Sequence, residues 1–160
     1  MKRFMAFILT LVMSLSLLTG CGSDPVAEEF GNFMNVEMVE INAHYDKITA
    51  EAGKWAAFET DAQLVSSIND VMLPTVNASL DMLGKIELET EEVIAIKAKY
   101  KKVLDAYKEG FELMLSGIQA NDEATMTKGT TKVEEGITLL NEYNAALEAL
   151  AAEKGFEIEY

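Results

Sequence analysis

Residues 91–154, EEVIAIKAKYKKVLDAYKEGFELMLSGIQANDEATMTKGTTKVEEGITLLNEYNAALEALAAEK, decide the fold of this chain. Apolar and small residues recur there at steps of three and four, which places them on one face of a helix. Asn121 and Asp122 interrupt the pattern and suit a turn followed by a helix N-cap. We therefore expect long helices over 91–118 and 123–154, packed as a hairpin. Their facing stripes are Val93, Ile96, Tyr100, Val103, Tyr107, Gly110, Met114 and Gly117, and Met126, Gly129, Val133, Gly136, Leu140, Tyr143, Leu147 and Leu150.

A third helix is expected over residues 25–52. Asp24 suits its N-cap, and Pro25 suits the first helical position, where its missing N–H is not needed. Apolar residues follow at alternating steps of four and three, which is typical of a bundle seam. That seam comprises Met34, Met38, Ile41, Tyr45, Ile48, Ala52 and Trp55.

A fourth helix is expected over residues 61–83. Thr60 and Gln63 have the spacing of a capping box at its start. Pro74 should kink it, because proline lacks the N–H of the helical hydrogen bond. Gly84 suits the position just after its end. The seam expected here is Phe58, Ala62, Val65, Met72, Val76, Leu80 and Leu83.

Four helices joined by short connections predict one architecture. The chain has only two prolines, and alternating strand-like stretches are missing. We therefore predict an all-α fold, an antiparallel up-down-up-down four-helix bundle over residues 25–155 with a tail over 156–160. Thr90 is expected to cap the helix over 91–118, and Gly155 to end the last helix.

The N-terminus has the layout of a secretion signal. Lys2 and Arg3 precede an almost wholly apolar stretch over 4–18, which is short for a membrane-spanning helix. The sequence Leu18-Thr19-Gly20-Cys21 follows, and it resembles the lipobox of bacterial lipoproteins. The resemblance implies a cleaved signal peptide over 1–20 and a lipidated tether over 21–24.

In such lipoproteins the cysteine thiol receives a diacylglycerol, so the resemblance makes Cys21 the lipidation site. It implies an exported protein held on the outer face of the cell membrane. Gly22 replaces the aspartate that typically retains such proteins at the inner membrane. Outer-membrane sorting is therefore expected if the source cell has two membranes.

Charge narrows the range of partners. The net charge is −14, and residues 1–20 contribute two positive charges and no acidic residue, so the remainder carries −16. Such a surface repels nucleic acid and disfavours lying flat on anionic lipid. We expect no nucleic acid partner. An acidic surface suits cationic ligands or divalent ions, although it also serves simply to keep a protein soluble.

Catalytic chemistry is sparse in this sequence. His44 is the only histidine, which excludes di-iron Glu-x-x-His pairs and multi-histidine zinc sites. No catalytic Ser-His-Asp set or glycine-rich phosphate loop is recognisable. We expect no enzyme, cofactor or metal. The favoured function is a non-enzymatic binding or interaction module for an envelope protein or cationic ligand, and the alternative is a small-ligand, metal or haem carrier with a cavity in the bundle.

Two sets of residues are candidate binding sites. The first is a partner-binding tip at the end away from the membrane, formed by Lys54, Trp55 and Phe58, because exposed aromatic residues often anchor partners. The alternative is that Trp55 and Phe58 plug the end of the core. The second is a ligand slot formed by Tyr100, Tyr107, Gly110, Gly117, Gly129, Gly136 and Tyr143.

The four glycines of that slot lie at inward positions of the hairpin, where each costs about 1 kcal/mol relative to alanine. They indicate either a slot for an apolar ligand or close packing of large against small residues. Antiparallel pairing predicts the contacts Gly110–Val133, Gly117–Met126, Gly129–Met114 and Gly136–Tyr107.

Overall fold

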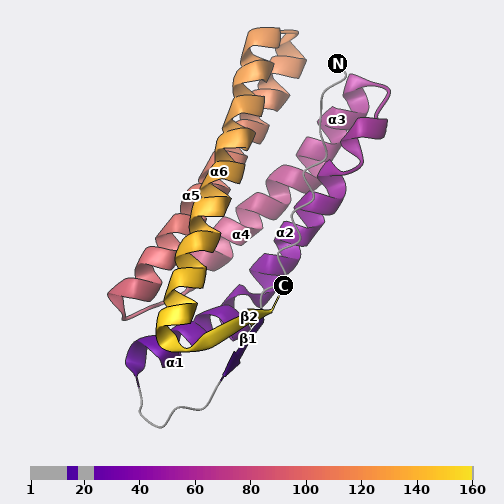
Figure 1. Ribbon diagram of the computed structural model, residues 1–160. Helices are drawn as coiled ribbons and strands as arrows, with labels where there is room; N and C mark the ends of the chain where they lie inside the picture. Colours follow the sequence, from indigo (N-terminus) through magenta and orange to yellow (C-terminus); the bar gives the residue numbers. More distant parts are fainter. Residues whose placement is uncertain (1–13, 18–23, 160) are drawn as a thin grey trace.

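The computed structural model describes residues 14–17 and 24–159, which form four helical arms and a short pair of strands (Figure 1). A mainly helical chain is therefore confirmed. The first two arms in chain order are composite, because π-helical turns (η1, η3) interrupt their α-helices. A 3-10 turn (η2) lies in the connection between these two arms. In chain order the elements are β1 (Ser14–Leu17), α1 (Pro25–Asn32), η1 (Phe33–Glu37), α2 (Met38–Ala52), η2 (Trp55–Ala57), α3 (Asp61–Ser67), η3 (Ile68–Met72), α4 (Leu73–Lys85), α5 (Glu91–Ala120), α6 (Glu123–Lys154) and β2 (Phe156–Glu159).

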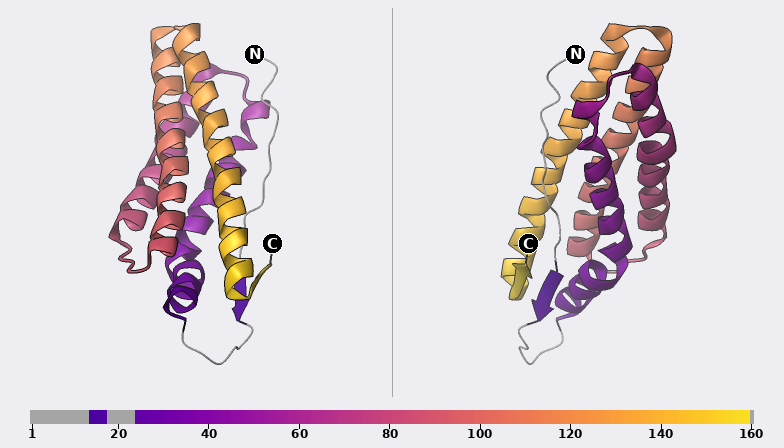
Figure 2. Two further views of the ribbon diagram at one scale, coloured as in Figure 1. Left: turned by 60° about the vertical axis from the view of Figure 1, so that its left-hand side comes forward. Right: turned by 90° about the vertical axis from the view of Figure 1, so that its right-hand side faces the viewer.

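The first arm comprises α1, η1 and α2 and bends at η1. Asp24 caps it as predicted, because its carboxylate accepts the Val26 N–H at 2.9 Å. α1 precedes the wide turn η1 and lies across the end of the molecule, at an angle to α2 (Figures 1 and 2). The expectation of a single helix over 25–52 is corrected to this bent arm. Phe30 and Phe33 are fully buried, so α1 closes that end of the core.

The second arm comprises α3, η3 and α4. Its predicted capping box is confirmed, since Thr60 and Gln63 exchange hydrogen bonds between side chain and backbone. The π-helical turn η3 ends with the Leu73 N–H donating to the Ile68 carbonyl, five residues earlier. This wide turn ends two residues before Pro74, whose ring disturbs a regular helix over the preceding turn.

The wide turn changes which side chains of the second arm are buried. Met72, Val76 and Leu83 of the expected seam are buried, whereas Ala62 is exposed. Residues outside the expected seam, Ile68, Thr75 and Ser79, are buried as well. The helix also continues through Gly84 and ends at Lys85, so Gly84 is not its stop signal.

α5 and α6 form the predicted hairpin. Asn121 adopts the left-handed conformation (φ 51°) that ends α5. Asp122 caps α6, since its carboxylate accepts the N–H groups of Ala124 at 3.0 Å and Thr125 at 3.3 Å. Gly155 ends α6 at φ 76°, also as predicted.

The all-α prediction needs one correction. Strands β1 and β2 pair antiparallel, with Ser14 opposite Glu159 and Leu17 opposite Phe156. The predicted tail over 156–160 therefore contains a strand, and its partner belongs to the predicted signal segment. The Phe156 ring packs edge-on against Phe30 at 5.5 Å between centroids, which attaches β2 to α1. The lipobox residues, Cys21 included, lie outside the described residues.

The core lies between the four arms, with α5 in contact with both α6 and α4 and with α2 packed on α4. The α5–α6 contact is by far the most extensive. Large side chains fill the core, and each one fully buried contributes about 1.5–3 kcal/mol. The largest of them are Tyr100, Tyr143, Phe30, Phe33, Phe111, Met34, Met38, Ile41, Ile68, Met72, Leu83 and Leu104.

Candidate functional site

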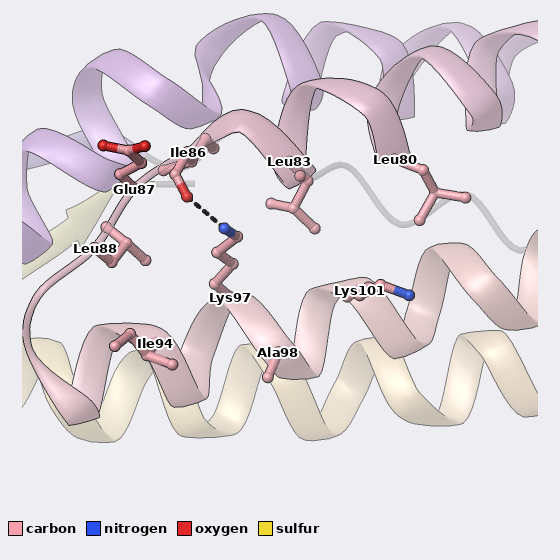
Figure 3. A pocket seen from close by; sticks show the side chains of 10 residues that line it. Leu80, Leu83, Ile86, Glu87, Leu88, Ile94, Lys97, Ala98 and Lys101 are labelled. Atoms are coloured by element: carbon pink, nitrogen blue, oxygen red, sulfur yellow. Dashed lines mark hydrogen bonds between the residues drawn. The ribbon is translucent and has the colours of Figure 1, made fainter.

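A half-open apolar pocket lies between α4 and α5 (Figure 3). The bordering helix segments, the end of α4 and the start of α5, lie at the end of the molecule where α1 begins (Figure 1). Its volume is about 490 Å³, within the range of small-molecule sites. The last turns of α4, the extended connection 86–90 and the start of α5 supply its walls. The lining comprises Leu80, Leu83, Gly84, Ile86, Glu87, Leu88, Ile94, Lys97, Ala98 and Lys101.

Two lysines stand over this apolar lining. Lys97 and Lys101 lie four residues apart, hence on the same face of α5. The Lys97 ammonium donates to the Ile86 carbonyl (Figure 3), and two of its three N–H groups remain for other acceptors. Lys101 pairs with Asp105 at 2.7 Å, but both side chains are about half exposed, so the pair is weak. Glu87 is the one carboxylate of the lining.

Glu29 of α1 holds the connection that forms one wall of the pocket. Its carboxylate accepts the backbone N–H of Glu89 at 2.5 Å, that of Thr90 at 2.8 Å, and the Thr90 hydroxyl. Partial burial acts to raise the pKa of Glu29, but these hydrogen bonds outweigh it and the pKa is lowered. The prediction that the Thr90 side chain caps α5 is wrong, because this hydroxyl faces Glu29 instead.

A second contact ties the same end of the molecule together. Lys154, in the last turn of α6, pairs with Asp24 at 3.0 Å. The hydrogen bond from Lys154 lowers the pKa of Asp24. The start of α1, the connection after α4 and the C-terminal strand therefore share one end, as the sequence predicted. The connections 53–60 and 121–122 lie at the other end (Figure 2).

At that other end, the residues predicted as a binding tip are divided. The half-buried Trp55 packs on the core, donates from Nε1 to Ser67 at 2.8 Å, and meets Phe111 edge-on at 6.1 Å. Phe58 borders a shallow hollow of about 430 Å³, and Lys54 is exposed and pairs with Glu51 at 2.6 Å. Trp55 thus plugs the core, while partner binding at the tip stays a prediction.

Two of the hairpin glycines lie directly against the backbone of the opposing helix. A Cβ atom at Gly117 would lie 2.4 Å from the Met126 backbone nitrogen. One at Gly129 would lie 2.6 Å from the backbone nitrogen of Met114. Both predicted pairings are confirmed, and a backbone neighbour cannot move aside as a flexible side chain can.

The other two glycines receive large side chains. A Cβ atom at Gly110 would lie 2.7 Å from the Val133 side chain, and one at Gly136 would lie 2.6 Å from the Tyr107 ring. These pairings are also confirmed. Close packing of large against small residues accounts for all four glycines, and the contacts leave no open slot beside them.

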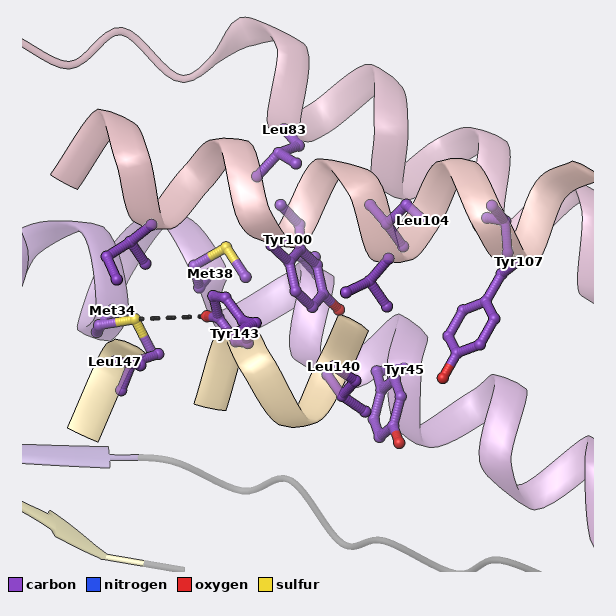
Figure 4. Packing of buried hydrophobic residues seen from close by; sticks show 14 of the residues in the cluster. Met34, Met38, Tyr45, Leu83, Tyr100, Leu104, Tyr107, Leu140, Tyr143 and Leu147 are labelled. Atoms are coloured by element: carbon purple, nitrogen blue, oxygen red, sulfur yellow. Dashed lines mark hydrogen bonds between the residues drawn. The ribbon is translucent and has the colours of Figure 1, made fainter. Parts of the chain in front are cut away.

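The tyrosines assigned to the slot lie in the core (Figure 4). Tyr100 and Tyr143 pack with ring centroids 4.9 Å apart, and the Tyr143 hydroxyl donates to the Met34 sulfur at 3.9 Å. The Tyr100 hydroxyl has no hydrogen-bond partner among the described residues. Burial raises the pKa of Tyr100, Tyr107 and Tyr143, which keeps them neutral. None of the three lines the α4–α5 pocket.

One pair with catalytic residue types is brought together by the fold. His44 Nδ1 lies 3.1 Å from the Ser79 hydroxyl, which itself donates to the Thr75 carbonyl at 3.0 Å. Because the hydroxyl has a single proton, it accepts from His44 and is not activated as a nucleophile. Ser79 is 1% exposed, so this pair is a packing contact between α2 and α4.

Within residues 14–17 and 24–159, no three His, Cys, Asp or Glu side chains gather into a group that could hold a metal ion. Nor does the described part of the chain contain a helix both long and apolar enough to cross a membrane. Comparison with protein-family models, curated proteins and solved structures found no match.

Helical seam positions do not predict this pocket, because most of its lining lies off the seams or in the connection 86–90. Leu88 lies in a connection and Ile94 lies beside the seam, where it is 44% exposed. A usable signal was the uneven distribution of charge, since five of the twelve lysines lie within 97–108 of a strongly acidic chain. Two of those lysines, Lys97 and Lys101, lie next to apolar residues off the seam, on the open face of α5.

Proposed function

We propose that this chain is a lipid-anchored lipoprotein of the cell envelope and acts as a non-enzymatic binding module. Its four arms form an up-down-up-down four-helix bundle, and its ligand site is the α4–α5 pocket. The observation that carries the proposal is that half-open pocket of about 490 Å³, apolar in its lining and cationic at its rim. Membrane attachment rests on the lipobox-like sequence ending at Cys21.

The anchor and the pocket belong to the same end of the molecule. Only a few residues separate Cys21 from α1, which begins at Pro25. At about 3.3–3.6 Å per residue, this tether spans little more than ~15 Å. The pocket therefore lies at the end of the molecule nearest the membrane, where apolar ligands are available.

Cleavage before Cys21 removes β1 and leaves β2 without its strand partner. Phe156 contacts α1 without involving β1. Its ring packs against Phe30, and a Cβ atom at Gly31 would lie 3.6 Å from it. The strand residues therefore stay attached to α1 in the mature protein, with one edge open.

A small-ligand carrier is the second candidate, and the pocket favours it over the metal or haem carriers of the same class. The lining residues include no histidine, cysteine or methionine, the side chains that hold haem iron or copper. The site lies at the edge between two helices, whereas a cavity in the centre of the bundle was expected.

Two experiments test the proposal. Cys21→Ala should abolish labelling by palmitate and release the protein from the membrane fraction, and continued labelling would contradict the anchor. Wild type, Ala98→Trp and Ala145→Trp are then purified from membranes, and bound small molecules are extracted and identified by mass spectrometry. Ala98 lies in the pocket, whereas Ala145 is exposed on α6. A compound lost only in Ala98→Trp supports a binding module; none, or equal amounts in all three, contradicts it.

A further inference from the structure

The α4–α5 pocket combines two features that together define a class of ligand. Its walls are apolar, with Leu83, Leu88 and Ile94 directed into the space between the helices (Figure 3). Its positive groups are confined to two consecutive turns of one wall, at Lys97 and Lys101. We propose that this site binds a single-chain anionic amphiphile of the fatty-acid type, with the carboxylate at the two lysines. This inference rests on the proposed binding function.

The carboxylate position follows from the hydrogen bonds of the lysines. Lys97 donates once, to the carbonyl of Ile86, which fixes its ammonium at the pocket and leaves donors for a ligand oxygen. Lys101 is 60% exposed, and among the described residues its ion-pair partner is Asp105, in a weak surface pair. Its ammonium can therefore turn to a second anion. Hydrogen bonds from an ammonium to a carboxylate are stronger than neutral ones.

The alkyl chain position follows from the remaining lining. From Lys97 toward the end where α1 begins, the walls consist of Ile86, Leu88 and Ile94, and Leu83 lies beside the ammonium (Figure 3). A chain laid there covers apolar surface that is otherwise wet, which is favourable in proportion to its area. Glu87, at the rim, repels a dianionic or bulky anionic headgroup, so one negative charge suits the site better than two.

The charge of the whole molecule makes this local arrangement informative. A chain with a net charge of −14 repels anions in general, so an anion binds only where positive charge is locally concentrated. The same field keeps the molecule from lying flat on anionic lipid. These two effects favour a monomeric ligand in the pocket over a membrane surface as the occupant.

The test uses the mature, lipid-anchored protein, which begins at Cys21, in phosphatidylcholine nanodiscs with a diazirine-bearing dodecanoate. Photo-cross-linking should label peptides covering 83–101, and unlabelled dodecanoate should compete about tenfold more effectively than dodecanol. Lys97→Gln and the double variant Lys97→Gln/Lys101→Gln should remove that preference. Lys102→Gln is the matched control, an exposed lysine of α5 outside the pocket. Thermal melts confirm that each variant folds.

The outcomes separate this inference from the proposed function. Equal competition by dodecanol and dodecanoate in the wild type would overturn the anionic ligand, and so would equal losses in Lys97→Gln and Lys102→Gln. Labelling outside the pocket that persists in Ala98→Trp would assign the probe to the surrounding bilayer and overturn the pocket site. If membrane extracts still yield a compound lost only in Ala98→Trp, the binding function stands and only the ligand class is wrong.

Discussion

The two sides of α5 differ in how completely they are filled. Toward α6, glycines bring the helices so close that Cβ atoms at Gly117 and Gly129 would lie 2.4 and 2.6 Å from backbone nitrogens. Toward α4, a Cβ atom at Gly84 would meet nothing within 4 Å, and a pocket of about 490 Å³ remains. One helix thus has a closed, tightly packed face and an open face that carries the proposed binding site.

This comparison shows why glycine alone is a poor guide to a binding site. The inward glycines of the hairpin suggested a slot, but every one receives a neighbouring residue. The open space instead lies where α4 ends and an extended connection follows, and it is marked by lysines above apolar side chains. In this strongly acidic chain, a local concentration of lysines is the better indicator of the pocket.

The largest expected effect is at the closed face. Gly129→Leu places a side chain against the Met114 backbone nitrogen and the Gly110 carbonyl, which cannot move without separating the helices. We expect a loss of about 3 kcal/mol in unfolding free energy, at the upper end of overpacking costs. The melting temperature should fall by on the order of 10 °C. A melt within a few degrees of wild type would contradict the close backbone contact.

Gly136→Leu should cost less, because its neighbour is the Tyr107 ring rather than backbone. We expect about 1–3 kcal/mol of destabilisation, measured by urea unfolding. Tyr107→Ala should relieve part of the cost of Gly136→Leu in the double variant, because it removes the side chain that clashes. Strictly additive effects would show that the two residues do not compete for the same space.

Acid should loosen the end of the molecule that holds the pocket. The pKa of Glu29 is lowered in the folded protein, so its hydrogen bonds stabilise fully above the ordinary glutamate pKa of 4.5 and are lost as the pH falls through the lowered value. Glu29→Gln should cost about 1 kcal/mol at neutral pH. In urea unfolding at a series of pH values, that difference should shrink once the pH falls below about 4. If the difference between wild type and Glu29→Gln did not depend on pH, the Glu29 carboxylate would not stabilise this end of the molecule.

The smallest expected effect is at the open face. Gly84→Ala lies in α4 with no neighbour near its Cβ position. Alanine there reduces the freedom of the unfolded chain and should stabilise the protein by about 0.4–1 kcal/mol. In thermal melts, Gly84→Ala should raise the melting temperature, whereas Gly129→Leu should lower it. A lower melting temperature for Gly84→Ala than for wild type would mean that the α4 side of α5 is tightly packed as well.

The hairpin could be predicted in detail because two constraints fix it. Glycines seven residues apart on each helix, and a turn at Asn121-Asp122, allow one antiparallel register, and the four expected contacts are those found. The caps at Asp24, Thr60 and Asp122 were also legible, since each needs a short polar side chain next to free N–H groups.

The bend of the first arm could not be predicted from the sequence. The π-helical turn η1 shifts the backbone hydrogen bonds by one residue, and its segment contains no proline that would mark the place. The β1–β2 pair was missed since two four-residue strands distant in sequence leave no periodic signal. The pocket was missed because open space depends on how α4 and the 86–90 connection meet α5, which no single helix pattern contains.

Hydrogen exchange of the mature, lipid-anchored protein in phosphatidylcholine nanodiscs tests the contrast between the two faces of α5 most directly. Peptides from 107–117 and 126–136 should exchange slowest and should not respond to dodecanoate. Peptides from 83–98 should exchange faster without ligand and should slow when dodecanoate is added, with no change in the Ala98→Trp variant. Equal protection of 83–98 and of the hairpin peptides would contradict this contrast between the two faces. A dodecanoate response centred on the glycine contacts would contradict it as well.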